Sequence, residues 1–199
     1  MKKGLIALLI VILLIIMVAG WFVGRYNKIQ KEKVTVENAW AQVQNVYQTR
    51  FDLVPNLVGT VQGAANFEKE TLTQVTEARA KMGGSINLPP EALTDPQAFQ
   101  AFQANQAGLS QALSRLMVVV ERYPELKANQ NFLQFQAQLE GIENRIRTER
   151  MRYNDAAKLF NQLIVTFPNN IIAGIINVKT FQFFQADAAA QTAPKVEFK

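Results

Sequence analysis

The sequence predicts an all-α protein, in which an N-terminal transmembrane helix is followed by an antiparallel bundle of long helices. Three observations support this fold class. The chain begins with an uncharged apolar run, its remaining apolar residues recur every three or four positions, and almost no stretch alternates as a strand does. We expect a transmembrane anchor over residues 1–24, a helical bundle over residues 25–184 and a flexible C-terminal tail over residues 185–199.

The anchor is predicted from the 20 uncharged residues between Gly4 and Val23. As a helix they would be about 30 Å long, which is the thickness of the hydrocarbon core of a bilayer. A cleaved signal peptide is the alternative, with Val18-Ala19-Gly20 resembling a cleavage site. Signal peptides have an apolar core of about 7–15 residues, however, and here Trp21 and Phe22 extend the run. We therefore expect an uncleaved single-pass anchor.

The charges indicate what the chain contacts. The formal net charge is +5, but six of the 21 basic residues and only one of the 16 acidic residues precede Val34. The rest of the chain is neutral, so the positive surplus flanks the anchor, where it can pair with lipid headgroups. This distribution predicts a lipid partner and no nucleic-acid partner, because nucleic-acid binding needs a basic face on the domain.

The chain has neither cysteine nor histidine. This absence excludes disulfides, thiolate nucleophiles and cysteine-bound metal centres, and it removes the usual general base. We therefore expect no cofactor and no enzymatic activity. A carboxylate enzyme is the remaining catalytic alternative, and its candidate residues are Asp52, Glu140, Glu143 and Glu149. Pairing of these carboxylates with residues on the same helix is the simpler interpretation.

The first helix of the bundle is predicted from apolar residues that advance from Val36 to Ala64 at an average spacing of 3.5. The pattern continues through Ala78, so we expect one helix that ends near Gly83. Within it, the stretch RFDLVPNLVGTVQ contains Pro55. Because the apolar spacing is the same on both sides, we expect a kinked but continuous helix. The carbonyl of Phe51 would then lack its usual donor, and Asn56 is a candidate to replace it.

Two further long helices follow. Asp95 is predicted to cap the second helix, which ends near Tyr123-Pro124. The third is predicted to begin near Asn129 and to end at Phe167-Pro168. A short apolar helix and the phenylalanine-rich stretch FQFF come next. The short connections after the second and third helices favour antiparallel packing.

Several polar residues could form a buried layer that fixes the register of the bundle. The candidates on the first and third helices are Arg50, Asp52, Asn56, Glu140, Asn144 and Arg150. Ordinary solvated charges are the alternative. Asn154 and Asn161 are seven residues apart, each after an aromatic residue, and therefore recur on one helix face.

Several stretches resemble the LemA family of bacterial membrane-anchored proteins. They include VENAWAQV, RFDLVPNLV, LSRLMVVVERYPELKAN, NFLQFQAQLEGIENRI and the closing APKVEF, so the resemblance covers nearly the whole chain after the anchor. It implies a single-pass anchor, an antiparallel bundle of long helices and no established enzymatic activity. Ile142 stands where members often have threonine.

The leading functional hypothesis is a non-enzymatic, membrane-anchored scaffold or adaptor that acts through protein–protein contacts, either with a partner protein or by self-association. A regulator of a membrane enzyme, such as a protease, is the alternative. We expect the chain in the bacterial cell (inner) membrane. Lysine and arginine counting favours a cytoplasmic bundle, whereas the resemblance to relatives with a lipobox favours an exported one, so both orientations stay open.

Overall fold

The computed structural model describes residues 2–63, 67–83 and 88–185, and these residues form helices and connecting segments without a strand. The all-α prediction is confirmed. The elements are α1 (Lys2–Gln62), α2 (Lys69–Met82), the 3₁₀ helix η1 (Pro90–Thr94), α3 (Pro96–Val120), α4 (Pro124–Lys127), α5 (Gln130–Val165) and α6 (Asn169–Ile175). The predicted flexible tail lies, from residue 186 onward, outside the described residues.

Helix α1 is one uninterrupted element of 61 residues, about 90 Å long at 1.5 Å per residue. Its first third contains the apolar segment between Gly4 and Val23, which is long and apolar enough to cross a membrane. Most of this segment is exposed within the part of the chain that the structure describes, with Leu13 and Ile16 at 60 % and 63 %, and Phe22 near its end packs against the bundle. The rest of α1 packs against the other helices of the bundle.

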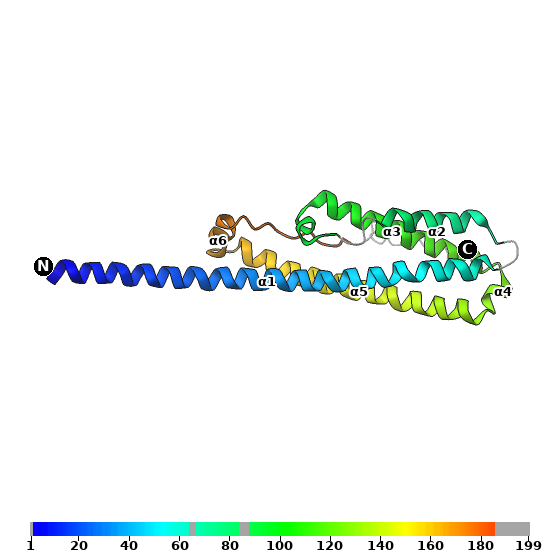
Figure 1. Ribbon diagram of the computed structural model, residues 1–199, viewed down its shortest axis with the longest axis horizontal. Coiled ribbons are helices and arrows are strands. Elements are labelled where there is room, and N and C mark those ends of the chain that lie inside the picture. Colours follow the sequence, from blue (N-terminus) through cyan, green and yellow to red (C-terminus); the bar gives the residue numbers. More distant parts are fainter. Residues whose placement is uncertain (1, 64–66, 84–87, 186–199) are drawn as a thin grey trace, which may run out of the picture.

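The bundle is antiparallel (Figure 1). Helix α5 runs back along the second half of α1 and is its main packing partner, while α2 packs chiefly on α3. The short helix α6 lies beside α1 where the apolar segment ends. After α6, residues 177–185 run without helical structure back toward the middle of the bundle; we call them the C-terminal segment.

The apolar interior is divided into two cores. The near core, next to the apolar segment, has Trp40, Phe99, Phe102, Tyr153, Phe160 and Phe184 among its largest buried side chains. The far core includes Leu57, Leu72, Met82, Leu113, Leu116 and Phe132. Helix α2 contributes only to the far core, whereas α6 and the C-terminal segment contribute only to the near core. The element that completes the bundle therefore changes along its length.

One predicted helix is in fact two. The sequence predicts a single helix up to Gly83, but α1 ends at Gln62 and α2 begins at Lys69 and folds back. Gly63 follows the last residue of α1, and glycine costs about 1 kcal/mol relative to alanine inside a helix. The 3.5-residue pattern could not reveal the break, because two helices that fold back each bury an apolar stripe just as one long helix does.

The predicted ends of the other helices agree more closely. The Asp95 side chain accepts hydrogen bonds from the backbone N–H groups of Gln97 and Ala98, which confirms it as the N-cap of α3. The Asn129 side chain caps α5 in the same way. Two short elements, η1 and α4, occupy regions where no helix was predicted.

Pro55 lies inside α1 and does not end it, as the sequence predicts. Because proline has no N–H, the carbonyl of Phe51 loses its helical donor. The proposed local rescue by Asn56 is wrong: Arg79 of α2 donates from Nε to this carbonyl at 3.2 Å. The Arg79 guanidinium also lies 3.8 Å from the centre of the Phe51 ring. The proline thus creates an acceptor that ties α2 to α1.

We expect Arg79→Met to lower the free energy of unfolding by about 1–2 kcal/mol, through loss of the hydrogen bond and the ring contact. In a Pro55→Ala background the Phe51 carbonyl regains a helical donor, so the same substitution should cost about half as much. Denaturant unfolding of the four chains of this double-mutant cycle measures the coupling. Lys81→Met, an exposed change in the same helix, is the control. Equal losses in both backgrounds would show that Arg79 does not serve the carbonyl.

Candidate functional site

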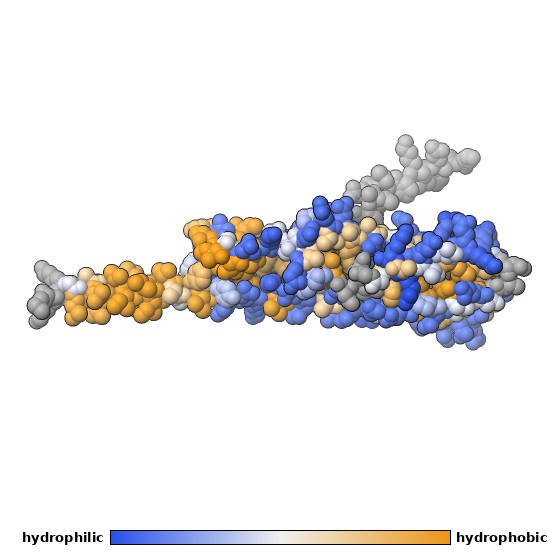
Figure 2. Space-filling view, turned by 45° about the horizontal axis from the view of Figure 1, so that its top comes forward, coloured by the Kyte–Doolittle hydropathy of each residue, from blue (hydrophilic) through white to orange (hydrophobic). Residues whose placement is uncertain are grey.

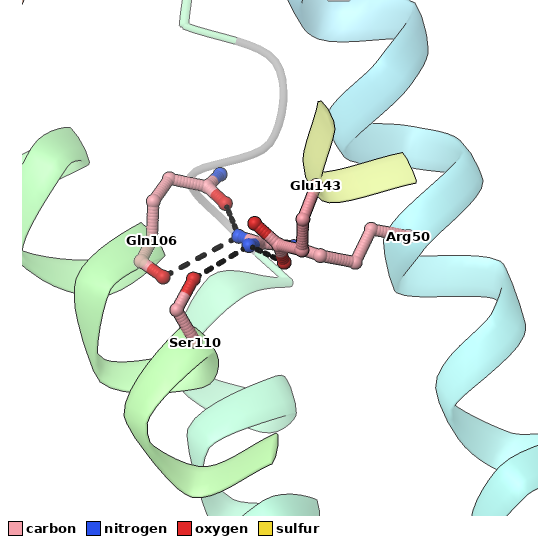
Figure 3. A network of polar contacts seen from close by, with 4 residues as sticks. All are labelled: Arg50, Gln106, Ser110 and Glu143. Carbon is pink, nitrogen blue, oxygen red and sulfur yellow. Dashed lines mark hydrogen bonds and ion pairs between the residues drawn. The ribbon is translucent and has the colours of Figure 1, made fainter. Parts of the chain in front are cut away.

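Arg50 of α1 is a charged side chain in the interior, with 1 % of its surface exposed. Its Nη1 donates to the Ser110 hydroxyl at 2.7 Å and to a Glu143 carboxylate oxygen at 2.8 Å. Its Nη2 donates to the backbone carbonyl and the side-chain oxygen of Gln106. Figure 3 shows the guanidinium group between α3, which carries Gln106 and Ser110, and Glu143 of α5. We call these four residues the polar cluster.

The polar cluster lies between the two cores. On α1, Arg50 stands between Tyr47 of the near core and Val54 of the far core. On α3, Gln106 stands between Phe102 of the near core and Leu109 of the far core. All three long helices therefore place a polar residue at one level, where the C-terminal segment gives way to α2 as the covering element.

The charges of the polar cluster are unequally buried. Glu143 keeps 35 % of its side chain exposed, so this partner of Arg50 remains accessible to solvent. Within the described residues, Arg50 Nε and Gln106 Nε2 are buried without a hydrogen-bond partner, although the Arg50 guanidinium lies 5.1 Å from the centre of the Tyr47 ring. The hydrogen bonds of Arg50 thus connect α1 to both α3 and α5.

Of the six predicted site residues, the polar cluster contains only Arg50. Asp52, Asn56, Glu140 and Asn144 are exposed, and the Asp52 carboxylate accepts a hydrogen bond from Gln48 on its own helix. Glu143, a candidate carboxylate expected to pair within its own helix, instead binds Arg50 of α1. Arg147, four residues later on the same helix, donates to Asn144.

The two asparagines on one face of α5 hold the C-terminal segment. Asn161 Nδ2 donates to the carbonyl of Phe181, and its Oδ1 accepts from the Phe181 N–H, both at 2.9 Å. Asn154 makes the same pair of bonds with Phe184, at 3.0 and 2.9 Å. Each side-chain amide thus replaces a β-strand partner for an extended backbone. We call this arrangement the asparagine clamp.

Neighbouring residues strengthen the asparagine clamp. The Tyr153 hydroxyl donates to the carbonyl of Gln182 at 3.0 Å, and burial raises the pKa of Tyr153 well above its usual range, so it remains a neutral donor. Arg150 donates to the carbonyl of Gln185 at 3.0 Å and lies over the Phe184 ring. Arg150, a predicted member of the polar layer, therefore contacts the C-terminal segment.

A cleft of about 550 Å³ opens beside the polar cluster. Polar residues from α3 and α5 line much of it, among them Gln103, Gln111, Ser114, Arg147 and Arg150. In the part of the chain that the structure describes, no three acidic side chains gather as a metal site would require. The hydrogen bonds of the site are made largely to backbone and amide groups.

The amino-acid sequence matches a known protein family. The profile of the LemA family matches residues 39–198, which includes the described part of the bundle from Ala39 onward. "Protein LemA" of Metamycoplasma hominis is 27 % identical over 83 % of this chain and 71 % of its own length. "Magnetosome protein MamQ" of Magnetospirillum gryphiswaldense is 28 % identical over 96 % of this chain and 77 % of its own.

"Magnetosome protein MamQ 1" and "MamQ 2" of Paramagnetospirillum magneticum are each 28 % identical over 84 % of this chain and 67 % of their own length. The family match includes Arg50, the rest of the polar cluster and both clamp asparagines, and it begins after the apolar segment. The chain belongs to the LemA family.

Proposed function

We propose that the protein is a membrane-anchored helical scaffold that acts through contacts with other proteins and catalyses no reaction itself. Residues 1–24 cross the bacterial inner membrane once, and the bundle of residues 25–184 presents the binding surface. The observation that supports this proposal most is the continuity of α1 between its apolar segment and the far end of the bundle.

The continuity of α1 has a mechanical consequence. A helix without a flexible linker transmits the position of its membrane segment to everything packed on it. From Val23 to Gln62 the helix rises by about 60 Å, so the far core is held at a fixed distance from the bilayer. Such an arrangement suits a protein that positions its partners relative to the membrane. The similarity to "Magnetosome protein MamQ" also supports a membrane-associated role.

Crosslinking in cells followed by mass spectrometry tests this proposal. Lys69, Lys81, Lys127 and Lys158 are exposed on three helices, so an amine-reactive reagent can sample several faces of the bundle. We expect reproducible crosslinks to at least one other protein. A chain with these four lysines replaced by arginine is the control, because it keeps the charges but removes these four reactive amines, so crosslinks through them should disappear.

Self-crosslinks alone would contradict the adaptor role and favour a structural homo-oligomer. Recovery of a membrane enzyme whose activity changes when the chain is deleted would favour the alternative, a regulator of that enzyme. Because the chain has no cysteine, a single cysteine at position 118 and an impermeant thiol reagent on intact cells would also report on which side of the membrane the bundle lies.

A further inference from the structure

The α5–α6 turn and α6 expose large apolar side chains. Phe167 is 80 % exposed, Ile171 54 % and Ile175 67 %. On the opposite side of α6, Ile172 and Ala173 are buried in the near core. In Figure 2 apolar surface gathers on the part of the bundle that adjoins the apolar segment of α1. We call Phe167, Ile171 and Ile175 the α6 patch.

The α6 patch lies at the level where α1 would leave a bilayer. Phe22, in the apolar segment, packs against the near core, which also contains Ile29 of α1 and Ile172 of α6. Ile29 is only six residues past Val23, a rise of about 9 Å. The headgroup region beyond the hydrocarbon core is about 5–8 Å thick on each side. Ile29 is thus near the outer edge of this region, and α6 lies beside α1 where the apolar segment ends (Figure 1), so α6 adjoins the interfacial part of α1.

The basic residues near the α6 patch are complementary in charge to an anionic lipid surface. Between Val165 and Thr180 the sequence contains no acidic residue. The exposed side chains of Lys28 and Lys179 stand on the adjoining parts of α1 and the C-terminal segment. Trp21, which is 42 % exposed, lies near the end of the apolar segment, where tryptophan is enriched in membrane proteins. Basic residues beside apolar ones are typical of interfacial helices.

We propose that the α6 patch is a second membrane contact, which inserts into the interfacial region of the same bilayer that α1 crosses. The proposal rests on the proposed function for its anchor. Lipid is the favoured occupant because the patch adjoins the apolar segment and because Val165 to Thr180 contains a lysine and no acidic residue. The second contact would fix the rotation of the bundle about α1, since only one face of the bundle can then meet the membrane.

Lipid-specific quenching of a fluorescent label tests this proposal on the full chain. The absence of cysteine allows single-cysteine variants Ile175→Cys, Val118→Cys and Val11→Cys, each labelled with the same small dye. Val118 is 70 % exposed at the far end of α3 and is the matched control for an exposed apolar site. The variants are reconstituted in phosphatidylglycerol-containing vesicles with lipids brominated near the headgroup or deep in the acyl chain.

We expect shallow brominated lipids to quench the label at position 175 at least threefold more than the label at position 118, and deep brominated lipids to quench position 11. If position 175 resembles position 118 while position 11 is quenched, the second contact is wrong and the anchor stands. If position 11 is not quenched, the anchor itself is wrong. A label at position 175 that is shielded from water but not quenched by lipid would overturn the proposal in favour of a protein neighbour.

Discussion

Replacing Trp40 with alanine is expected to lower the free energy of unfolding by about 4 kcal/mol, because large aromatic side chains in a core cost about 3–5 kcal/mol when truncated. Trp40 is 1 % exposed. Its ring lies 5.1 Å from that of Phe102 and 5.5 Å from that of Tyr153, centre to centre. Its Nε1 also donates to the carbonyl of Leu88 at 3.0 Å. The substitution would thus remove both a ring packed among rings and a tether to the segment before η1.

Denaturant unfolding in detergent, followed by circular dichroism, measures this loss. The chain contains two tryptophans, and Trp21→Ala is the matched control because Trp21 is 42 % exposed on the apolar segment. Trp40→Phe should give an intermediate loss, since it keeps an aromatic ring but removes the indole donor. A loss below 1 kcal/mol for Trp40→Ala would contradict a central role for this residue in the near core.

Replacing Glu143 with alanine is expected to cost about 2–3 kcal/mol. Removing one partner of a buried ion pair typically costs 3–5 kcal/mol, because the other charge stays buried without compensation. Here Arg50 would be that charge, at 1 % exposure, and the partial exposure of Glu143 reduces the expected cost. Glu140→Ala is the control, because Glu140 is exposed one turn earlier on the same helix.

A second substitution tests the cause of this loss. In a chain that also carries Arg50→Met, the buried charge is gone, so Glu143→Ala should cost less than 1 kcal/mol. The same denaturant measurement on the four chains of the cycle gives the coupling between the two residues. If Glu143→Ala costs no more than Glu140→Ala, the bond between Arg50 and Glu143 does not stabilise the bundle.

The sequence predicts the helices of this fold better than it predicts how they meet. Apolar spacing and the capping residues Asp95 and Asn129 locate α3 and α5 because these signals are local. The reversal after Gln62 is invisible to the same spacing. Arg79 as the donor to the Phe51 carbonyl could not be foreseen, because it depends on that reversal.

In the candidate site, too, the sequence identifies some residues but not the partners that they contact. Arg50 stands out in the sequence because it is a charged residue beside an apolar stripe, but its partners Gln106 and Ser110 are on a helix whose register against α1 depends on packing. The recurrence of Asn154 and Asn161 is visible, whereas their target is not. They bind backbone atoms of an extended segment, and backbone atoms carry no sequence pattern.

The asparagine clamp also determines when the fold can be completed during synthesis. Phe184, held by Asn154, has its ring centre 6.1 Å from that of Trp40, although the two are 144 positions apart in the chain. At about 5–20 residues per second, a ribosome needs roughly 7–30 s to make this stretch. The early part of α1 would reach the membrane well before its aromatic neighbour exists. A nascent chain released before Phe181 would therefore leave the near core open at the membrane surface, where quality-control proteases or chaperones could recognise the exposed rings.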